Sequence, residues 1–153
     1  MKVRDTVKAL MHQGKGILAA DESVKTITER FAALGITSSE DTRRAYRELL
    51  VTTPGADRYL SGVILYDETI RQALSDGIPF PEYLFAHSIQ TGIKVDTGIE
   101  HDPQFGGLVT KGLEGLRARL KEYASLGASF TKWRATTTVG TPPGSQTLRE
   151  NAS

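Results

Sequence analysis

Short apolar runs alternate with amphipathic stretches along this chain. The apolar runs lie at residues 16–20, 62–66, 91–95 and 128–135, and each has the length of a β-strand. Residues 62–66 are apolar at successive positions, as in a strand that is covered on both faces. The alternation predicts four β-α units, with the strands in a parallel sheet and the helices packed outside it.

The stretches between these strands carry helical spacing and helix-end signals. The sequence Thr37-Ser38-Ser39-Glu40 fits a capping box, and we expect Ala45, Tyr46, Leu49 and Leu50 to form the apolar face behind it. A loop is predicted at residues 96–107, and a segment rich in Thr, Pro and Gly at residues 136–144. Helices are predicted at residues 3–11, 27–33, 40–50, 81–86, 113–124 and, at the end of the chain, 145–151.

Charged residues interrupt or end three of the apolar runs. Strand side chains alternate between faces, so Lys94 shares a face with Asp96, and Lys132 shares one with Arg134; Asp21 follows the first strand. Burying an unpaired charge costs several kcal/mol, roughly, so such charges are usually paired, close to water or functional. Functional side chains in parallel α/β folds come from the C-terminal ends of strands, so we expect a polar, ligand-binding mouth there.

Composition narrows the class of protein. The 153 residues have the size of one domain, with 39% hydrophobic and 24% charged residues, as in globular proteins. The formal net charge is +1, which gives no general reason to expect nucleic acid or a membrane as a partner. Cysteine is absent, and His12, His87 and His101 lack metal-ligand spacing, so we expect no metal site. No signal-type or membrane-spanning apolar run is present, and a cytoplasmic location is expected.

Five segments, taken in order, resemble the class I fructose-bisphosphate aldolases. They are residues 14–23 (GKGILAADES), 43–50 (RRAYRELL), 62–69 (GVILYDET), 92–98 (GIKVDTG) and 132–134 (KWR). The resemblance implies a (β/α)8 TIM barrel, of which this chain covers about the first four β/α units. A complete barrel needs about 250 residues, or at least ~200. Residues 1–153 are therefore interpreted as the N-terminal half of one barrel domain.

The resemblance also implies an activity. The family cleaves fructose 1,6-bisphosphate reversibly to dihydroxyacetone phosphate and glyceraldehyde 3-phosphate in glycolysis, through a lysine Schiff base and without a metal or other cofactor. By the motifs, Asp21 resembles the carboxylate that assists proton transfer at the cleaved hydroxyl. Lys132 resembles the lysine beside the Schiff base, and Arg134 the arginine that steadies neighbouring carboxylates. Asp67 and Glu68 receive no chemical step and are interpreted as structural.

A phosphate site is implied as well. Ser23 and Thr26 resemble the hydroxyls that hold the far phosphate of the substrate, with Lys94 as its cation and Arg30 as a weaker candidate. Structural alternatives remain for several of these residues. Asp21 would also suit an N-cap, the pair of Lys94 and Asp96 a simple ion pair, and Lys132 a lysine reaching to water from a strand edge.

Some features depart from the family pattern. Thr26 stands where serine is common, and Thr136-Thr137-Thr138 replaces an apolar continuation of the fourth strand. The Schiff-base lysine, the catalytic glutamates and the second phosphate site have no match in this chain, so we expect a fragment or a divided gene product. The alternative is a catalytically inactive half-barrel that binds phosphate or a partner chain. The family implies a homo-oligomer, usually a tetramer, but the sequence does not decide between fructose 1,6-bisphosphate and fructose 1-phosphate.

Overall fold

A four-stranded parallel sheet organises the chain, as the apolar runs predict. The computed structural model describes residues 3–12, 14–101, 108–136 and 149. The strands are β1 (Gly16–Ala20), β2 (Leu60–Leu65), β3 (Gln90–Lys94) and β6 (Phe130–Lys132), in the order β1-β2-β3-β6. The order follows the sequence, and each neighbouring pair is parallel. The C-terminal ends of all four strands therefore meet at one rim.

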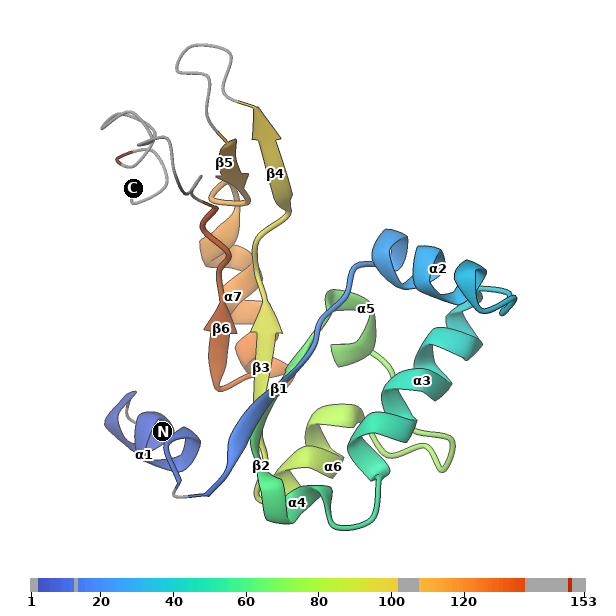
Figure 1. Cartoon of the computed structure of the whole chain (residues 1–153). Coiled ribbons are helices and arrows are strands. Elements are labelled where there is room, and N and C mark those ends of the chain that lie inside the picture. Colours follow the sequence, from blue (N-terminus) through green and yellow to red (C-terminus); the bar gives the residue numbers. More distant parts are fainter. Residues whose placement is uncertain (1–2, 13, 102–107, 137–148, 150–153) are drawn as a thin grey trace.

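Seven helices accompany the described strands. In Figure 1, α1 lies near the N-terminal ends of the strands, and α2 lies beyond the C-terminal end of β1. The helices are α1 (Val3–Leu10), α2 (Val24–Ala33), α3 (Glu40–Thr52), α4 (Ala56–Tyr59), α5 (Asp67–Ile70), α6 (Phe80–Ala86) and α7 (Leu116–Ser125).

The hydrophobic core lies between the two central strands and the helices. Val63 and Leu65 of β2 and Ile93 of β3 are fully buried, together with Phe80 and Leu84 of α6. By contrast, β1 is largely exposed before its last residue. The interpretation of residues 16–20 as a buried strand therefore holds for Ala20 and in part for Leu18, which packs against the core, and is wrong for Gly16, Ile17 and Ala19. The reason is topological, because β1 forms an edge of the described sheet and has a strand on one side only.

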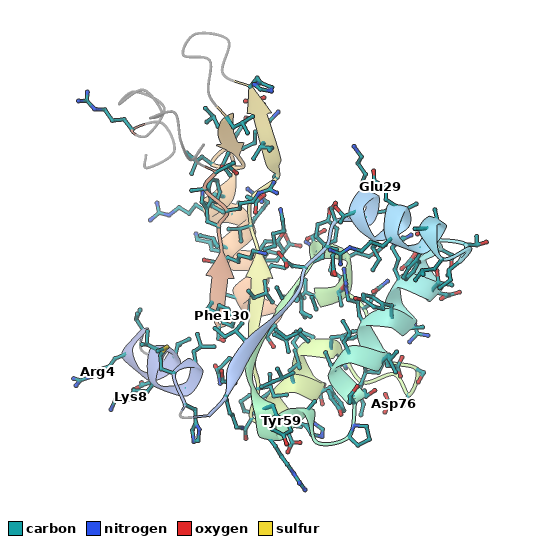
Figure 2. All side chains as sticks on the ribbon, in the orientation of Figure 1. Arg4, Lys8, Glu29, Tyr59, Asp76 and Phe130 are labelled. Atoms are coloured by element: carbon teal, nitrogen blue, oxygen red, sulfur yellow. The ribbon has the colours of Figure 1, made fainter. Side chains whose placement is uncertain are left out.

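Two glycines create room for an aromatic ring against the sheet. A Cβ atom on Gly92 would lie 2.4 Å from Phe130 Cζ, and one on Gly62 would lie 2.7 Å from Leu10 Cδ2 and 3.3 Å from the same ring. Figure 2 shows Phe130 at the start of β6. The ring therefore fills the space that side chains of β2 and β3 would otherwise occupy, two residues before Lys132.

The start and the buried face of α3 differ from the sequence prediction. Ser39, in extended conformation, is the N-cap, and the reciprocal capping partner is Thr42 rather than Glu40. The predicted apolar face is only partly right. Leu50 packs against the core and Tyr46 against Phe31, but Leu49 is 66% exposed, while Arg47 and Val51 are buried. An ion pair explains the burial of Arg47, because its guanidinium pairs with the Glu22 carboxylate on the β1–α2 loop.

The predicted loop at residues 96–107 contains a strand. β4 (Gly98–His101) pairs antiparallel with β5 (Leu108–Lys111), and this pair extends beyond the C-terminal end of β3 (Figure 1). Backbone pairing stabilises it, although its sequence has little apolar alternation. The fourth parallel strand is shorter than the predicted residues 128–135. The predicted helix at residues 145–151 and the segment 136–144 lie almost entirely outside the described residues.

Candidate functional site

The rim of the sheet holds a cavity of about 520 Å³. All seven residues that the sequence assigns to a site line it. Asp21, Lys94, Lys132 and Arg134 come from the ends of strands or directly after them, and Ser23, Thr26 and Arg30 from the β1–α2 loop and α2. The remaining lining residues are Ala19, Glu22, Tyr66, Asp96, Thr97 and Gly98.

An ion pair joins the two edge strands across the cavity. Lys132 Nζ donates a hydrogen bond of 2.6 Å to Asp21 Oδ2, although 111 positions separate the two residues in sequence. The Asp21 side chain is 8% exposed and that of Lys132 is 35% exposed. Asp21 is not the N-cap of α2, because Ser23 holds that position. The sheet thus brings a nearly buried carboxylate and a partly exposed amine into contact.

A second charged group lies at the end of β3. Lys94 Nζ donates to Asp96 Oδ1 at 2.6 Å and to the Asp96 carbonyl at 2.8 Å. Arg134 Nη2 lies 3.7 Å from the same Oδ1. The expected ion pair of Lys94 and Asp96 therefore forms, and both residues also line the cavity. The Asp96 side chain is fully buried, and its Oδ2 has no hydrogen-bond partner among the described residues.

The first turn of α2 contributes hydroxyl groups. Ser23 Oγ accepts a hydrogen bond from the Thr26 backbone N–H, and the two hydroxyl oxygens lie 3.0 Å apart. A helix N-terminus presents backbone N–H groups and a positive dipole end, which favour an anion. Arg30 lies one turn further along, mostly exposed, and pairs with Glu22 at 2.5 Å. This side of the cavity therefore offers both hydroxyl donors and positive charge.

The cavity carries a slight excess of positive charge. Its lining has four cationic side chains (Arg30, Lys94, Lys132 and Arg134) and three carboxylates (Asp21, Glu22 and Asp96). The carboxylates are all paired with cations, and the net positive charge of the lining favours an anionic ligand.

Tyr66 and Asp96 also line this cavity, although sequence reasoning gave Tyr66 no role and considered Asp96 only as a partner of Lys94. Burial raises the pKa of the Tyr66 hydroxyl, and the neighbouring carboxylates Asp67 and Glu68 raise it further, so the group stays protonated at neutral pH. Their position in the sequence could have identified both residues as part of the site, because each lies at the end of an apolar run at the functional rim. Asp67 and Glu68 are absent from the lining, and they contact Arg71 and Arg43 instead.

Within residues 3–12, 14–101 and 108–136, no three His, Asp or Glu side chains gather as a group able to hold a metal ion. None of the helices described is both long and apolar enough to cross a membrane.

Comparison with known proteins gives consistent results. The family model described as "Glycolytic: Fructose-bisphosphate aldolase class-I" matches residues 2–153. A probable fructose-bisphosphate aldolase class 1 of Xanthomonas axonopodis pv. citri is 56% identical over 140 residues, which cover 91% of this chain and 42% of that protein. The cytosolic fructose-bisphosphate aldolase 5 of Arabidopsis thaliana is 47% identical over 149 residues, or 96% of this chain and 42% of that protein.

A solved structure extends the likeness to three dimensions. It is a ternary co-crystal structure of fructose-bisphosphate aldolase from Plasmodium falciparum in complex with TRAP and a small molecule inhibitor. The match has a TM-score of 0.88 and 39% identity, and covers 95% of this chain and 43% of that chain. The α/β fold with its parallel sheet thus matches part of an aldolase TIM barrel, and this chain spans about two fifths of the length of these relatives. The chain belongs to the class I fructose-bisphosphate aldolase family.

Proposed function

We propose that the complete protein carrying this chain is a fructose-bisphosphate aldolase. It cleaves fructose 1,6-bisphosphate reversibly to dihydroxyacetone phosphate and glyceraldehyde 3-phosphate. The observation that carries this proposal is the convergence of all seven candidate residues on one cavity at the strand C-terminal ends. In this proposal, residues 1–153 form the N-terminal half of the barrel domain, and the protein acts in the cytosol as a homo-oligomer.

The proposed chemistry divides the work between this chain and the rest of the barrel. A lysine outside residues 1–153 attacks the ketose carbonyl, and the resulting iminium accepts the electron pair released by C–C cleavage. Asp21 assists the proton transfer at the hydroxyl of the bond that is cleaved. Lys132 places a positive charge beside the reacting lysine, which lowers the pKa of that amine and keeps part of it neutral. The contact of 2.6 Å between Lys132 and Asp21 supports a shared position for the two residues.

The remaining residues bind and orient the substrate. The hydroxyls of Ser23 and Thr26, with the N-terminus of α2 behind them, donate to the far phosphate. Lys94 and Arg30 neutralise its charge. Arg134 lies 3.7 Å from the buried Asp96 carboxylate, which it steadies together with Lys94.

Cleavage of the substrate by the complete protein tests this proposal. We expect triose phosphate to be released from fructose 1,6-bisphosphate at the same rate with and without EDTA, because the Schiff-base route needs no metal. Fructose 1-phosphate, used in parallel, measures the substrate preference. Cleavage that EDTA abolishes and a divalent metal restores would refute the Schiff-base route. Binding of the sugar phosphate without cleavage would favour the inactive half-barrel alternative.

A further inference from the structure

A buried guanidinium lies beneath the loop that connects β1 to α2. Arg47, on the third turn of α3, has a side chain only 3% exposed. It contacts neither strand β3 nor β6 through the hydrogen bonds described, and it does not line the cavity. A charge buried this deeply is costly unless it is paired and hydrogen-bonded, so its partners indicate what it does.

Among the described residues, both side-chain hydrogen bonds of Arg47 go to Glu22. Nη1 donates to the Glu22 carboxylate, and Nη2 donates to the Glu22 backbone carbonyl at 2.8 Å. The other carboxylate oxygen of Glu22 accepts from Arg30 Nη1 at 2.5 Å. Glu22 is therefore held at its main chain and at both side-chain oxygens.

The position of Glu22 gives these contacts a consequence for the site. It stands directly between Asp21, which contacts Lys132, and Ser23, which caps α2. The peptide unit is planar, so fixing the Glu22 carbonyl also fixes the direction of the Ser23 N–H. It thereby orients the peptide that leads into the N-cap of α2. The contacts that fix Glu22 therefore also restrain its two neighbours: Asp21, the candidate proton-transfer group, and Ser23, a candidate phosphate donor.

Aromatic side chains of α2 and α3 pack next to the Arg47 guanidinium. Arg47 Cζ lies 5.3 Å from the centroid of the Tyr46 ring, and that ring meets Phe31 of α2 edge-on at 5.7 Å. Helix α3 therefore has a polar contact with the β1–α2 loop and an aromatic contact with α2. A lysine in place of Arg47 would keep the charge but lose the planar fork that reaches both oxygens.

We propose that Arg47 is a positioning residue, which holds the β1–α2 loop so that Asp21 and the Ser23–Thr26 hydroxyls face the cavity together. This inference rests on the proposed aldolase function for its kinetic consequences. Arg47 touches no substrate and acts through Glu22. Losing the hold shifts Asp21, which lowers kcat, and shifts the phosphate donors, which raises KM. A displacement of ~1 Å can cost ~10²-fold in rate, so we expect kcat/KM to fall by about 10- to 100-fold.

The experiment compares Arg47→Lys and Arg47→Met with matched variants of Arg44 in the complete protein. Arg44 lies on the same helix and also binds a carboxylate, that of Glu48, but it has no described contact with the β1–α2 loop. Kinetics are measured at a temperature at which circular dichroism shows every variant to be folded. We expect kcat and KM both to worsen in Arg47→Lys, and both to stay within twofold in Arg44→Lys.

A double-mutant cycle separates positioning from a general loss of stability. Asp21→Asn removes the group that the loop positions, so Arg47→Lys should reduce kcat much less in that background than in the unchanged protein. Equal reductions in both backgrounds would overturn the inference. So would unchanged kinetics in Arg47→Lys.

Hydrogen exchange provides a readout that needs no activity. We expect backbone amides of residues 20–30 to exchange at least tenfold faster in Arg47→Lys than in Arg44→Lys, while β2 and β3 exchange at the same rate in both. Equal protection of residues 20–30 in both variants would overturn the positioning role. If Arg47→Met does not fold, the lysine pair and Glu22→Gln carry the comparison. Absence of cleavage by the unchanged protein would refute the proposed function, and the exchange result would still decide the role of Arg47.

Discussion

Replacing Asp21 by asparagine tests the proposed chemistry at a single group. Asparagine keeps the shape of the side chain and one carbonyl oxygen, but it carries no charge and cannot take up a proton. In the structure the change converts the 2.6 Å ion pair with Lys132 into a hydrogen bond to a neutral acceptor. A hydrogen bond to a charged group contributes about 1.5–3 kcal/mol. Because Lys132 is 35% exposed and water can solvate it, we expect the free energy of unfolding to fall by only about 1–2 kcal/mol.

The effect of Asp21→Asn on activity should be much larger than its effect on stability. A positioned acid–base group contributes about 10²- to 10⁴-fold in rate, so kcat for cleavage of fructose 1,6-bisphosphate should fall by that factor. KM should change only a few-fold, because Ser23, Thr26 and Lys94 remain. Steady-state release of triose phosphate, measured on folded protein, provides both constants.

Asp67→Asn is the matched control for this experiment. Like Asp21, Asp67 lies just after a strand of the sheet and pairs with a cation, Arg71. Unlike Asp21, it lies outside the cavity lining. We expect its kcat to be unchanged. If Asp21→Asn kept kcat within threefold of the unchanged protein, or raised KM alone, Asp21 would have no part in proton transfer.

Three further predictions follow from particular contacts. Lys94→Met should raise KM for fructose 1,6-bisphosphate about 10- to 100-fold with kcat retained, because one charge-assisted hydrogen bond to phosphate is worth about 1.5–3 kcal/mol. Gly92→Ala should lower the free energy of unfolding by about 1–3 kcal/mol in chemical denaturation, since the new methyl group overlaps the Phe130 ring. Burial alone would raise the pKa of Asp67, but hydrogen bonds from Arg71 and Tyr123 outweigh it and hold the pKa below the usual 3.8. The unfolded chain therefore takes up this proton first, so stability should fall as the pH drops through and below 3.8, less steeply in Asp67→Asn.

Each of these predictions has an outcome that contradicts it. An equal loss of activity toward phosphate-free ketoses would show that Lys94 is not a phosphate ligand. If the double variant lost as much stability as Gly92→Ala and Phe130→Ala lose together, the ring and the residue at position 92 would not be in contact. Identical acid unfolding of Asp67→Asn and the unchanged protein would rule out the stabilising role of the Asp67 contacts.

The sequence predicted the sheet well because strand and helix periods are local properties. Each apolar run overlaps a parallel strand, and side-chain alternation together with the strand-end rule placed Asp21, Lys94 and Lys132 at one rim. The exposure of β1 was not predictable in the same way. Apolar strands inside a sheet and at its edge look alike in sequence, and only the pairing order distinguishes them.

The errors concern contacts between distant segments. Amphipathic spacing placed Leu49 inside and ignored Arg47, because the carboxylate that draws Arg47 inward lies 25 positions away. Asp96 was seen to share a face with Lys94, but its complete burial depends on the surrounding structure. Tyr66 was counted as part of a strand, but β2 ends at Leu65, and Tyr66 lies directly after it in the cavity lining.

Trapping the covalent intermediate tests the central claim most directly. The complete protein is reduced with borohydride in the presence of dihydroxyacetone phosphate, and the modified peptide is identified by mass spectrometry. The account predicts one stoichiometric adduct on a lysine outside residues 1–153, and none on the isolated chain of residues 1–153. An adduct on Lys132 or Lys94, or the absence of any adduct on the complete protein, would contradict the assignment of roles in this half of the barrel.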